Sequence, residues 1–320
     1  MMNTKIVYVL VSDESDYYYE QVMLSIRSLI NNNPDVRIEV LVDAATYASL
    51  KGNREAIKQF AEIIEVDTPA DYDKMRRSRY LKTNMRNLVA GDFLFLDCDT
   101  VVCESIEDID KLDVNLGMVA DLNGPLLLDD ENTISKGLKA GFPDFTGKPY
   151  FNSGVIFVKD TDMNRRFFNS WYENYLKSES HGVFNDQPAL CQTNSESGNI
   201  ISEIPGIWNC QFKMKGFPYL KKSKVMHYYA NNGKNALPFH IKEIFERVKR
   251  IGDVDDYVMS LLKIPRTVFY SLLDMNQDKA FEYLTSDMVY YYYVHPRLFR
   301  LVSRMMSMYS ICRNSDKYGG

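Results

Sequence analysis

The chain has 320 residues, of which 45% are hydrophobic, so it is long enough to bury one large α/β core with an appendage. Its formal net charge of −5 argues against a generally basic surface, and no nucleic-acid partner is expected. The five cysteines form neither a CxxC pair nor a cluster with histidine, which argues against a structural zinc site and a disulfide framework.

The first third of the chain alternates between strand patterns and helix patterns. A continuous apolar run at residues 6–11 predicts a strand that is buried on both faces, and residues 38–43 and 63–66 are expected to form two further strands. Helical spacing at residues 18–31 ends in an Asn-Asn-Asn-Pro stop signal, and a polar helix is expected at residues 47–61. This alternation predicts an α/β fold with a parallel sheet and right-handed crossovers.

A basic helix is predicted at residues 75–88, followed by a short apolar strand at residues 93–96. The acidic pair Asp97 and Asp99 follows this strand directly. Ligands of open α/β sheets gather at the carboxyl ends of strands, and both carboxylates lie at such an end.

Further strands are predicted at residues 117–121 and 154–158, and helices at residues 167–176 and 188–191. Residues 122–149 are rich in Gly, Asp and Pro, and we expect them to form a loop that serves as a lid or contacts an acceptor.

The Asp97-Cys98-Asp99 triplet is the first candidate site. In a turn just past a strand, the two carboxylates can converge on one hard cation such as Mn²⁺ or Mg²⁺. Such a cation would bridge the two phosphates of a nucleotide diphosphate and act as a Lewis acid on the departing diphosphate. The same triplet taken alone also fits ordinary solvated carboxylates, and the preceding strand favours the metal hypothesis.

Several motifs, in order along residues 5–229, together resemble those of glycosyltransferase family 8, whose members are retaining enzymes with a GT-A fold. The motifs are a strand that ends in Ser12 and Asp13, the basic segment SRYLK at 78–82, FLDCDT at 95–100, FNSGV at 151–155, NDQPAL at 185–190 and VMHY at 225–228. The resemblance implies a Rossmann-like, mostly parallel sheet flanked by helices. It also implies transfer of a hexose-type sugar from a UDP-sugar to a glycan or lipid-linked acceptor.

The resemblance further implies roles for particular residues. His227 would be the third ligand of the metal, beside Asp97 and Asp99. The catalytic residues beneath the donor sugar would be Asp186, Gln187 and Asn152. The residues expected to contact the nucleotide or substrate are Ser12, Asp13, Arg79, Lys82, Asp97, Cys98, Asp121, Ser153 and Lys234.

Each of these residue types also has a purely structural interpretation. Asn152 can bond a turn backbone, and Gly154 can relieve crowding. Asp186 and Gln187 precede a proline and can cap a helix. A lone histidine on an apolar strand is more often a core residue than a ligand, and only the carboxylate pair elsewhere favours the ligand role for His227.

Two departures from the family pattern stand out. The family follows its histidine with a glycine and a Lys-Pro-Trp-like segment, whereas this chain continues with YYANNGKN at residues 228–235, where Gly233 and Lys234 are the nearest equivalents. Residues 122–149 align with nothing in the family, so the acceptor is not identified.

The catalytic domain is expected to span residues 1–236, and residues 237–320 to form a helical region. Residues 296–313 carry four arginines and no acidic residue, interleaved with apolar side chains. This pattern fits a helix at the surface of a membrane, and equally a helix packed on the catalytic domain or on a second subunit. No stretch reaches the roughly 20 apolar residues that span a bilayer, and no secretory signal is evident. We therefore expect a cytoplasmic protein, with any membrane contact peripheral and on the inner face.

The sequence is also compatible with three other functions. FLDCDTV at residues 95–101 also matches haloacid-dehalogenase-like phosphatases, in which Asp97 would be the nucleophile and Asp99 the general acid/base. A sugar-phosphate nucleotidylyltransferase would share the sheet but needs a Gly-rich phosphate loop after the first strand, and this chain lacks one. A catalytically silent nucleotide-sugar-binding scaffold is the third alternative.

Overall fold

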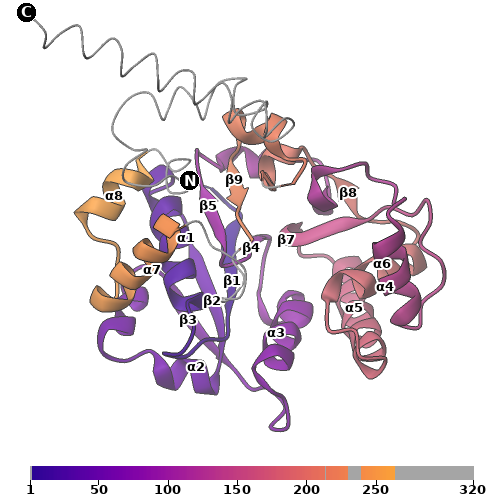
Figure 1. Ribbon diagram of the computed structural model, residues 1–320, viewed down its shortest axis with the longest axis horizontal. Coiled ribbons are helices and arrows are strands. Elements are labelled where there is room, and N and C mark those ends of the chain that lie inside the picture. The colour runs from indigo at the N-terminus through magenta and orange to yellow at the C-terminus, as the bar shows by residue number, and fades with distance from the viewer. Residues whose placement is uncertain (1, 213, 230–238, 264–320) are drawn as a thin grey trace, which may run out of the picture. The chain divides into compact units, whose positions relative to one another are not determined.

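The computed structural model describes residues 2–212, 214–229 and 239–263, and Figure 1 shows their arrangement. These residues fall within one compact unit, residues 1–269. No helix in the described ranges is both long enough and apolar enough to cross a membrane.

A seven-stranded sheet forms the centre of the unit, in the order β3-β2-β1-β4-β7-β6-β8. All neighbouring strands are parallel except at β7, which is antiparallel to both β4 and β6. The α/β class and the mostly parallel sheet are therefore confirmed. The strands are β1 (Lys5–Leu10), β2 (Ile38–Asp43), β3 (Glu62–Val66), β4 (Phe93–Leu96), β6 (Leu116–Ala120), β7 (Phe151–Val158) and β8 (Ser202–Glu203).

The reversal at β7 was not expected from the alternating pattern. β6 ends at Ala120, which pairs with Phe151 at the start of β7. The chain therefore returns to the sheet at the same end from which it left. Parallel strands would need a crossover to the opposite end, and none is present between β6 and β7. β7 also begins three residues before the predicted strand at 154–158, so that Phe151, Asn152 and Ser153 belong to it as well.

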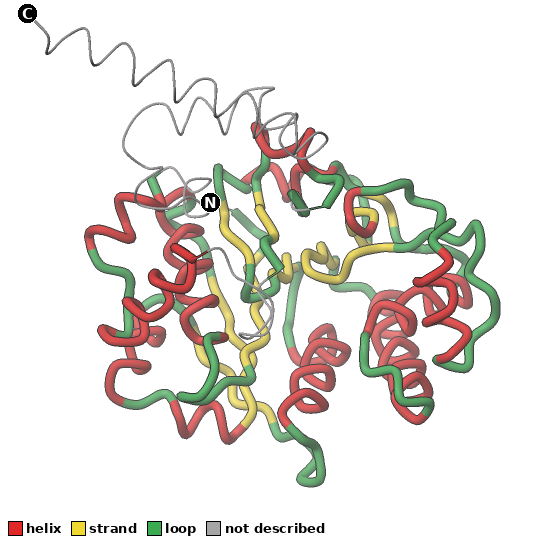
Figure 2. Tube along the Cα trace, in the orientation of Figure 1, coloured by secondary structure: helices red, strands yellow, loops and turns green. Residues whose placement is uncertain are grey.

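Helices cover both faces of the sheet (Figures 1 and 2). Alternate residues of β1 show why this strand is apolar throughout. Val7 and Val9 join the core cluster that also holds Leu81 of α3, whereas the Tyr8 hydroxyl hydrogen-bonds Ser25 of α1 on the opposite face. The helices of this part of the chain are α1 (Tyr18–Asn32), α2 (Ala44–Ser49), η1 (Gly52–Gln59), α3 (Lys74–Leu88), α5 (Asp162–Ser180) and α6 (Asp186–Glu196). The single polar helix expected at 47–61 is thus wrong, because the chain breaks it into α2 and η1.

A second, two-stranded sheet lies beside the first. It pairs β5 (Thr100–Val102) antiparallel with β9 (Val225–His227), in a register that sets Thr100 opposite His227. The Tyr228 N–H donates to the Asp99 carbonyl at 3.1 Å, which continues the pairing past the end of the ladder. This small sheet brings the histidine to the acidic pair from more than 120 positions away in sequence.

Residues 122–149 are not the simple loop that their composition suggested. They contain α4 (Glu131–Lys139), whose N-terminus is capped by the Asp130 side chain. Gly137 in this helix has no Cβ, and a Cβ there would lie 2.5 Å from the ring of Phe145. α4 is only nine residues long and Gly137 is its one buried residue, so the segment resembles a loop in composition.

The remaining short elements are η2 (Glu107–Lys111), η3 (Asp121–Asn123), η4 (Gly206–Trp208) and η5 (Phe217–Lys222). Beyond them, α7 (Phe239–Ile251) and α8 (Asp256–Leu262) both contact α1. The domain boundary expected after residue 236 lies outside the described residues and stays a prediction, and the same holds for the arginine-rich pattern at 296–313.

Candidate active site

The carboxylates of Asp97 and Asp99 converge with His227 at the carboxyl end of β4. One ligand atom from each residue lies within 4.8 Å of the others, and Nε2 of His227 is 3.2 Å from Oδ1 of Asp99. The turn after β4 makes this possible, because the Asp97 N–H donates to the Gly154 carbonyl at 2.8 Å and Thr100 Oγ1 donates to the Asp97 carbonyl at 2.8 Å. Asp97 and Asp99 thus point to one place instead of to opposite faces of a strand.

Gly154 makes room for the histidine. A Cβ at this position would lie 2.3 Å from Cε1 of His227 and 2.9 Å from Oδ1 of Asn152. The ladder between β6 and β7 is irregular here, since Val119 pairs with Asn152 but Met118 pairs with Ile156. This bulge carries Gly154 to the site, as bulges beside active sites commonly do.

Asn209 orients the imidazole of His227. The buried Asn209 Nδ2 donates to Asn152 Oδ1 at 2.8 Å, so the remaining amide oxygen faces His227 Nδ1 at 3.3 Å. This arrangement places a ring hydrogen on Nδ1, so that Nε2, which faces the carboxylates, is the nitrogen that a cation would use, and proteins commonly orient a metal-binding histidine in this way. Asn209 was not among the predicted site residues, because a single asparagine after η4 belongs to no motif.

These three ligands fit a divalent cation. Burial alone lowers the pKa of His227, but the charges of Asp99 and Asp97 outweigh it and raise the pKa above the ordinary value. The same negative field attracts a cation, and two carboxylates with one imidazole suit Mn²⁺ or Mg²⁺. Within the described part of the chain, this is the one group of three such side chains close enough to share an ion.

Lys82 connects the acidic pair to Asp186. Its side chain is only 3% exposed, and Nζ donates to both carboxylate oxygens of Asp97, at 3.0 and 3.2 Å. The same Nζ lies 3.3 Å from Ser153 Oγ and 3.5 Å from Oδ2 of Asp186. Three residues that the sequence assigned to separate motifs therefore surround one ammonium group.

Asp186 is buried and remains ionised. Ser153 Oγ donates to its Oδ2 at 2.8 Å, and Arg79 Nε lies 3.6 Å from its Oδ1. Burial alone would raise the pKa of Asp186, but Arg79 and Lys82 hold it well below its usual range. Asp186 is the first residue of α6, and the cap of this helix is Asn185, not Asp186 or Gln187 as the structural alternative held.

Asn152 and Gln187 meet at Asp121. Asn152 Nδ2 donates to Asp121 Oδ1 at 3.0 Å, and Gln187 Nε2 donates to the same oxygen at 2.9 Å. Burial raises the pKa of Asp121, although the two amides oppose the shift. Asn152 Oδ1 also accepts from the Gly154 N–H at 2.9 Å, so Asn152 makes the bond to the backbone that its structural interpretation predicts as well.

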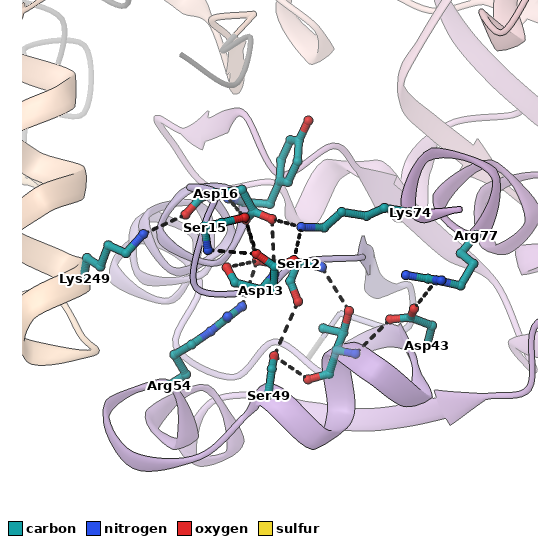
Figure 3. Close-up of polar contacts among 12 residues, drawn as sticks. Ser12, Asp13, Ser15, Asp16, Asp43, Ser49, Arg54, Lys74, Arg77 and Lys249 are labelled. Atoms are coloured by element: carbon teal, nitrogen blue, oxygen red, sulfur yellow. Dashed lines mark hydrogen bonds and ion pairs between the residues drawn. The ribbon is translucent and has the colours of Figure 1, made fainter. Parts of the chain in front are cut away.

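Ser12 and Asp13 lie in a polar cluster at the carboxyl end of β1, shown in Figure 3. Ser12 is buried, and its hydroxyl donates to Asp16 at 2.7 Å while accepting from Arg54 at 2.7 Å. Lys74 pairs with both Asp13 and Asp16 (Figure 3), and its hydrogen bond holds the pKa of Asp13 below the usual range. Their predicted contact with a nucleotide stays a prediction, since both side chains are engaged by protein groups.

Cys98 and Lys234 are the two remaining residues of the predicted site. Cys98 points back into the sheet, where its thiol donates to the Val9 carbonyl at 3.3 Å and burial raises its pKa well above the ordinary value. Lys234 lies outside the described residues, and its role stays a prediction.

Comparison with known proteins places this arrangement in a family. The profile of Glycosyl transferase family 8 matches residues 9–235, which include the acidic pair and His227. A search of curated proteins found no match.

Two solved glycosyltransferases show the same fold at low sequence identity. The galactosyltransferase LgtC in complex with donor and acceptor sugar analogues is 18% identical, with a TM-score of 0.54 over 79% of this chain and 98% of that one. The glycosyltransferase GlyE of Streptococcus pneumoniae TIGR4 is 16% identical, with a TM-score of 0.51 over 83% of this chain and 65% of that one. Since the family match covers more than half of the chain, the protein belongs to glycosyl transferase family 8 and is a glycosyltransferase.

Proposed function

We propose that the protein transfers a hexose-type sugar from a UDP-sugar to a glycan or glycolipid acceptor, with retention of configuration and with Mn²⁺ or Mg²⁺ as cofactor. The observation that carries the proposal is the convergence of Asp97, Asp99 and His227 beside the buried carboxylate of Asp186. Family membership does not agree with the phosphatase and nucleotidylyltransferase alternatives. By analogy with bacterial members of the family, the proposed setting is the synthesis of a surface polysaccharide.

Asp97, Asp99 and His227 would hold the cation, which when bound neutralises charge on the UDP leaving group as a Lewis acid. Arg79, at 30% side-chain exposure, adds a positive charge that a ligand can reach from solvent. We keep Ser12, Asp13, Lys82, Cys98, Ser153 and Lys234 as proposed contacts to the donor.

Asp186 is suited to electrostatic stabilisation more than to covalent attack. Its Oδ2 accepts from Ser153 and faces Lys82, and its Oδ1 faces Arg79, so both oxygens are engaged. A carboxylate fixed in this way can stabilise positive charge that develops at the anomeric carbon. Together with Gln187 and Asn152 beside Asp121, it supports attack of the acceptor hydroxyl from the face that the UDP leaves.

The proposal is tested by UDP release from a panel of UDP-sugars with Mn²⁺, with and without EDTA, beside phosphate release from a generic phosphomonoester. We expect UDP release that EDTA abolishes, with no phosphatase activity. Asp97→Asn and Asp99→Asn should each abolish UDP release, while Asp129→Asn, a change at an exposed carboxylate outside the site, should not. Wild-type turnover in either site variant would overturn the metal assignment.

We also propose a cytoplasmic protein whose residues 237–320 contact either the inner membrane face or a second subunit. The support is the arginine-rich, acid-free composition of residues 296–313. Sedimentation of the full-length chain with anionic vesicles, compared with its mass in solution, separates the two partners. Replacing Arg300 and Arg304 by Glu should abolish vesicle binding if the membrane is the partner.

A further inference from the structure

Tyr229 lies against the metal-ligand candidate His227. The two rings are stacked, with centroids 4.2 Å apart and an interplanar angle of 17°. Tyr229 adopts a left-handed backbone conformation with φ of 52°, which is rare for a residue with a bulky side chain. Such a conformation persists where the surroundings hold it, so the contacts of the side chain need an explanation.

The Tyr229 hydroxyl reaches the group of residues around Asp121. It donates to Gln211 Oε1 and accepts from Asn152 Nδ2 at 3.0 Å. Asn152 Nδ2 uses its other hydrogen on Asp121, the residue that also receives Gln187.

Asn209 closes a ring of contacts between the same groups. It links Nδ1 of His227 to Oδ1 of Asn152, and Tyr229 links the ring face of His227 to the amide nitrogen of Asn152. A rotation of the imidazole therefore disturbs Asn152 along two paths. Conversely, a ligand that fixes the Asn152 amide also restricts the imidazole.

We propose that Tyr229 is a positioning residue that couples binding of the cation at His227 to binding of the donor sugar at Asn152 and Asp121. This inference rests on the proposed function, since it assumes that both ligands bind there. Coupling of this kind is reciprocal: a bound sugar strengthens cation binding by the factor by which the cation strengthens sugar binding.

The test measures Mn²⁺ affinity by electron paramagnetic resonance for the full-length protein, alone, with UDP, and with a slowly reacting 2-deoxy-2-fluoro UDP-sugar. The change in Mn²⁺ affinity with UDP measures the contacts made through the diphosphate. The further change with the UDP-sugar measures the coupling between the cation and the sugar. In the wild type we expect the UDP-sugar to tighten Mn²⁺ binding several-fold more than UDP does, a change of about the size typical of allosteric coupling.

Tyr229→Phe keeps the ring on His227 and removes the hydroxyl. We expect its Mn²⁺ affinity without nucleotide to stay within about twofold of the wild type, and the additional effect of the sugar to disappear. Tyr229→Leu also removes the ring, and should weaken Mn²⁺ binding itself by about tenfold, as loss of a group that orients a metal ligand does. Tyr219→Phe, at an exposed tyrosine of η5, is the matched control and should behave as the wild type.

The outcomes separate this inference from the proposed function. A wild type that neither binds Mn²⁺ nor releases UDP would refute the proposed function itself. A wild type that does both, with Tyr229→Phe retaining the full additional effect of the sugar, would refute the coupling alone. Because Tyr229→Phe keeps the ring in place, this second result is informative even if Tyr229→Leu fails to fold.

Discussion

Nδ1 of His227 lies 3.3 Å from Oδ1 of Asn209, a residue that is fully buried and whose amide nitrogen is committed to Asn152. This contact determines which nitrogen of the imidazole carries the hydrogen. It therefore determines whether Nε2 can coordinate a cation together with Asp97 and Asp99.

Replacing Asn209 with Leu should weaken Mn²⁺ binding by about 10- to 100-fold, the usual effect of losing the partner of a ligating histidine. The variant leaves Nδ1 of His227 and Oδ1 of Asn152 without this partner, so we also expect a lower melting temperature. Calorimetric titration with Mn²⁺ on the folded variant measures the effect. Asn87→Leu, on the exposed side of α3, is the control, and equal affinities in the two variants would contradict the role of Asn209.

Gly154→Ala should displace His227. The added Cβ would lie 2.3 Å from Cε1 of the imidazole, so the ring must leave its position beside Gly154. Overpacking of this kind costs about 1–3 kcal/mol of stability, and we expect Mn²⁺ binding to be lost as well. Thermal unfolding and Mn²⁺ titration check both effects. Gly124→Ala is the control, because the nearest atom there is 3.4 Å from the new Cβ, and we expect its Mn²⁺ binding to be unchanged. Normal Mn²⁺ binding by Gly154→Ala would contradict the prediction, because it would mean that the imidazole can move without loss of the site.

Asp186→Asn should destabilise the fold as well as abolish transfer. The pKa of Asp186 is held below its unfolded value, so the ionised carboxylate stabilises the folded state above that unfolded value, near pH 4, and the stabilisation is lost as the pH falls further. At pH 7 the variant leaves Lys82 and Arg79 without their shared buried partner, which costs on the order of 3 kcal/mol. Urea unfolding at pH 7 and at pH 3 should show this difference shrinking in acid. A constant difference across that range would argue against an ionised Asp186.

Glu20→Gln should remove a pH dependence of stability. Burial raises the pKa of Glu20 to about 7, and Oε2 has no hydrogen-bond partner within the described residues. Because the folded-state pKa is raised, the wild type is most stable below the unfolded pKa of glutamate, near 4.5, and loses stability as the pH rises to about 7. The loss is on the order of 3 kcal/mol, at about 1.4 kcal/mol for each unit of pKa.

Urea unfolding at pH 5 and pH 8 tests this prediction. The wild type should lose stability between the two, whereas Glu20→Gln should change less and exceed the wild type at pH 8. Glu14→Gln, at an exposed carboxylate, provides the control. Parallel behaviour of wild type and Glu20→Gln would mean that Glu20 is not the buried titrating group.

The elements that were predicted well are those with a strong local pattern. The apolar runs of β1, β2 and β4 are buried on both faces, and the helical spacing of α1 ends at the expected Asn-Pro signal. α4 and the division of the chain into α2 and η1 were missed, because these helices are short and bury only one or two side chains each.

Asp97 and Asp99 were found from local sequence because the strand before them places them at the carboxyl end of the sheet. His227 needed the ordered set of motifs, since a histidine on an apolar strand has no distinctive pattern of its own. Asn209 and Tyr229 could not be found in either way. They lie on irregular segments, and their contacts to Asn152 join positions 57 and 77 residues apart.

Hydrophobic patterning and the order of the motifs are thus sufficient for the α/β class, the strand-end position of the acidic pair and the family. Both signals come from residues that are close together in sequence, so their spacing can be read directly from the chain. The partners of His227, Asp186 and Asn152 depend instead on the antiparallel return of β7 and the pairing of β5 with β9. Hydrogen bonds form only where donor and acceptor come within about 3 Å of each other. Only the tertiary structure brings such distant groups that close, and so it alone decides which of the many polar side chains form the site.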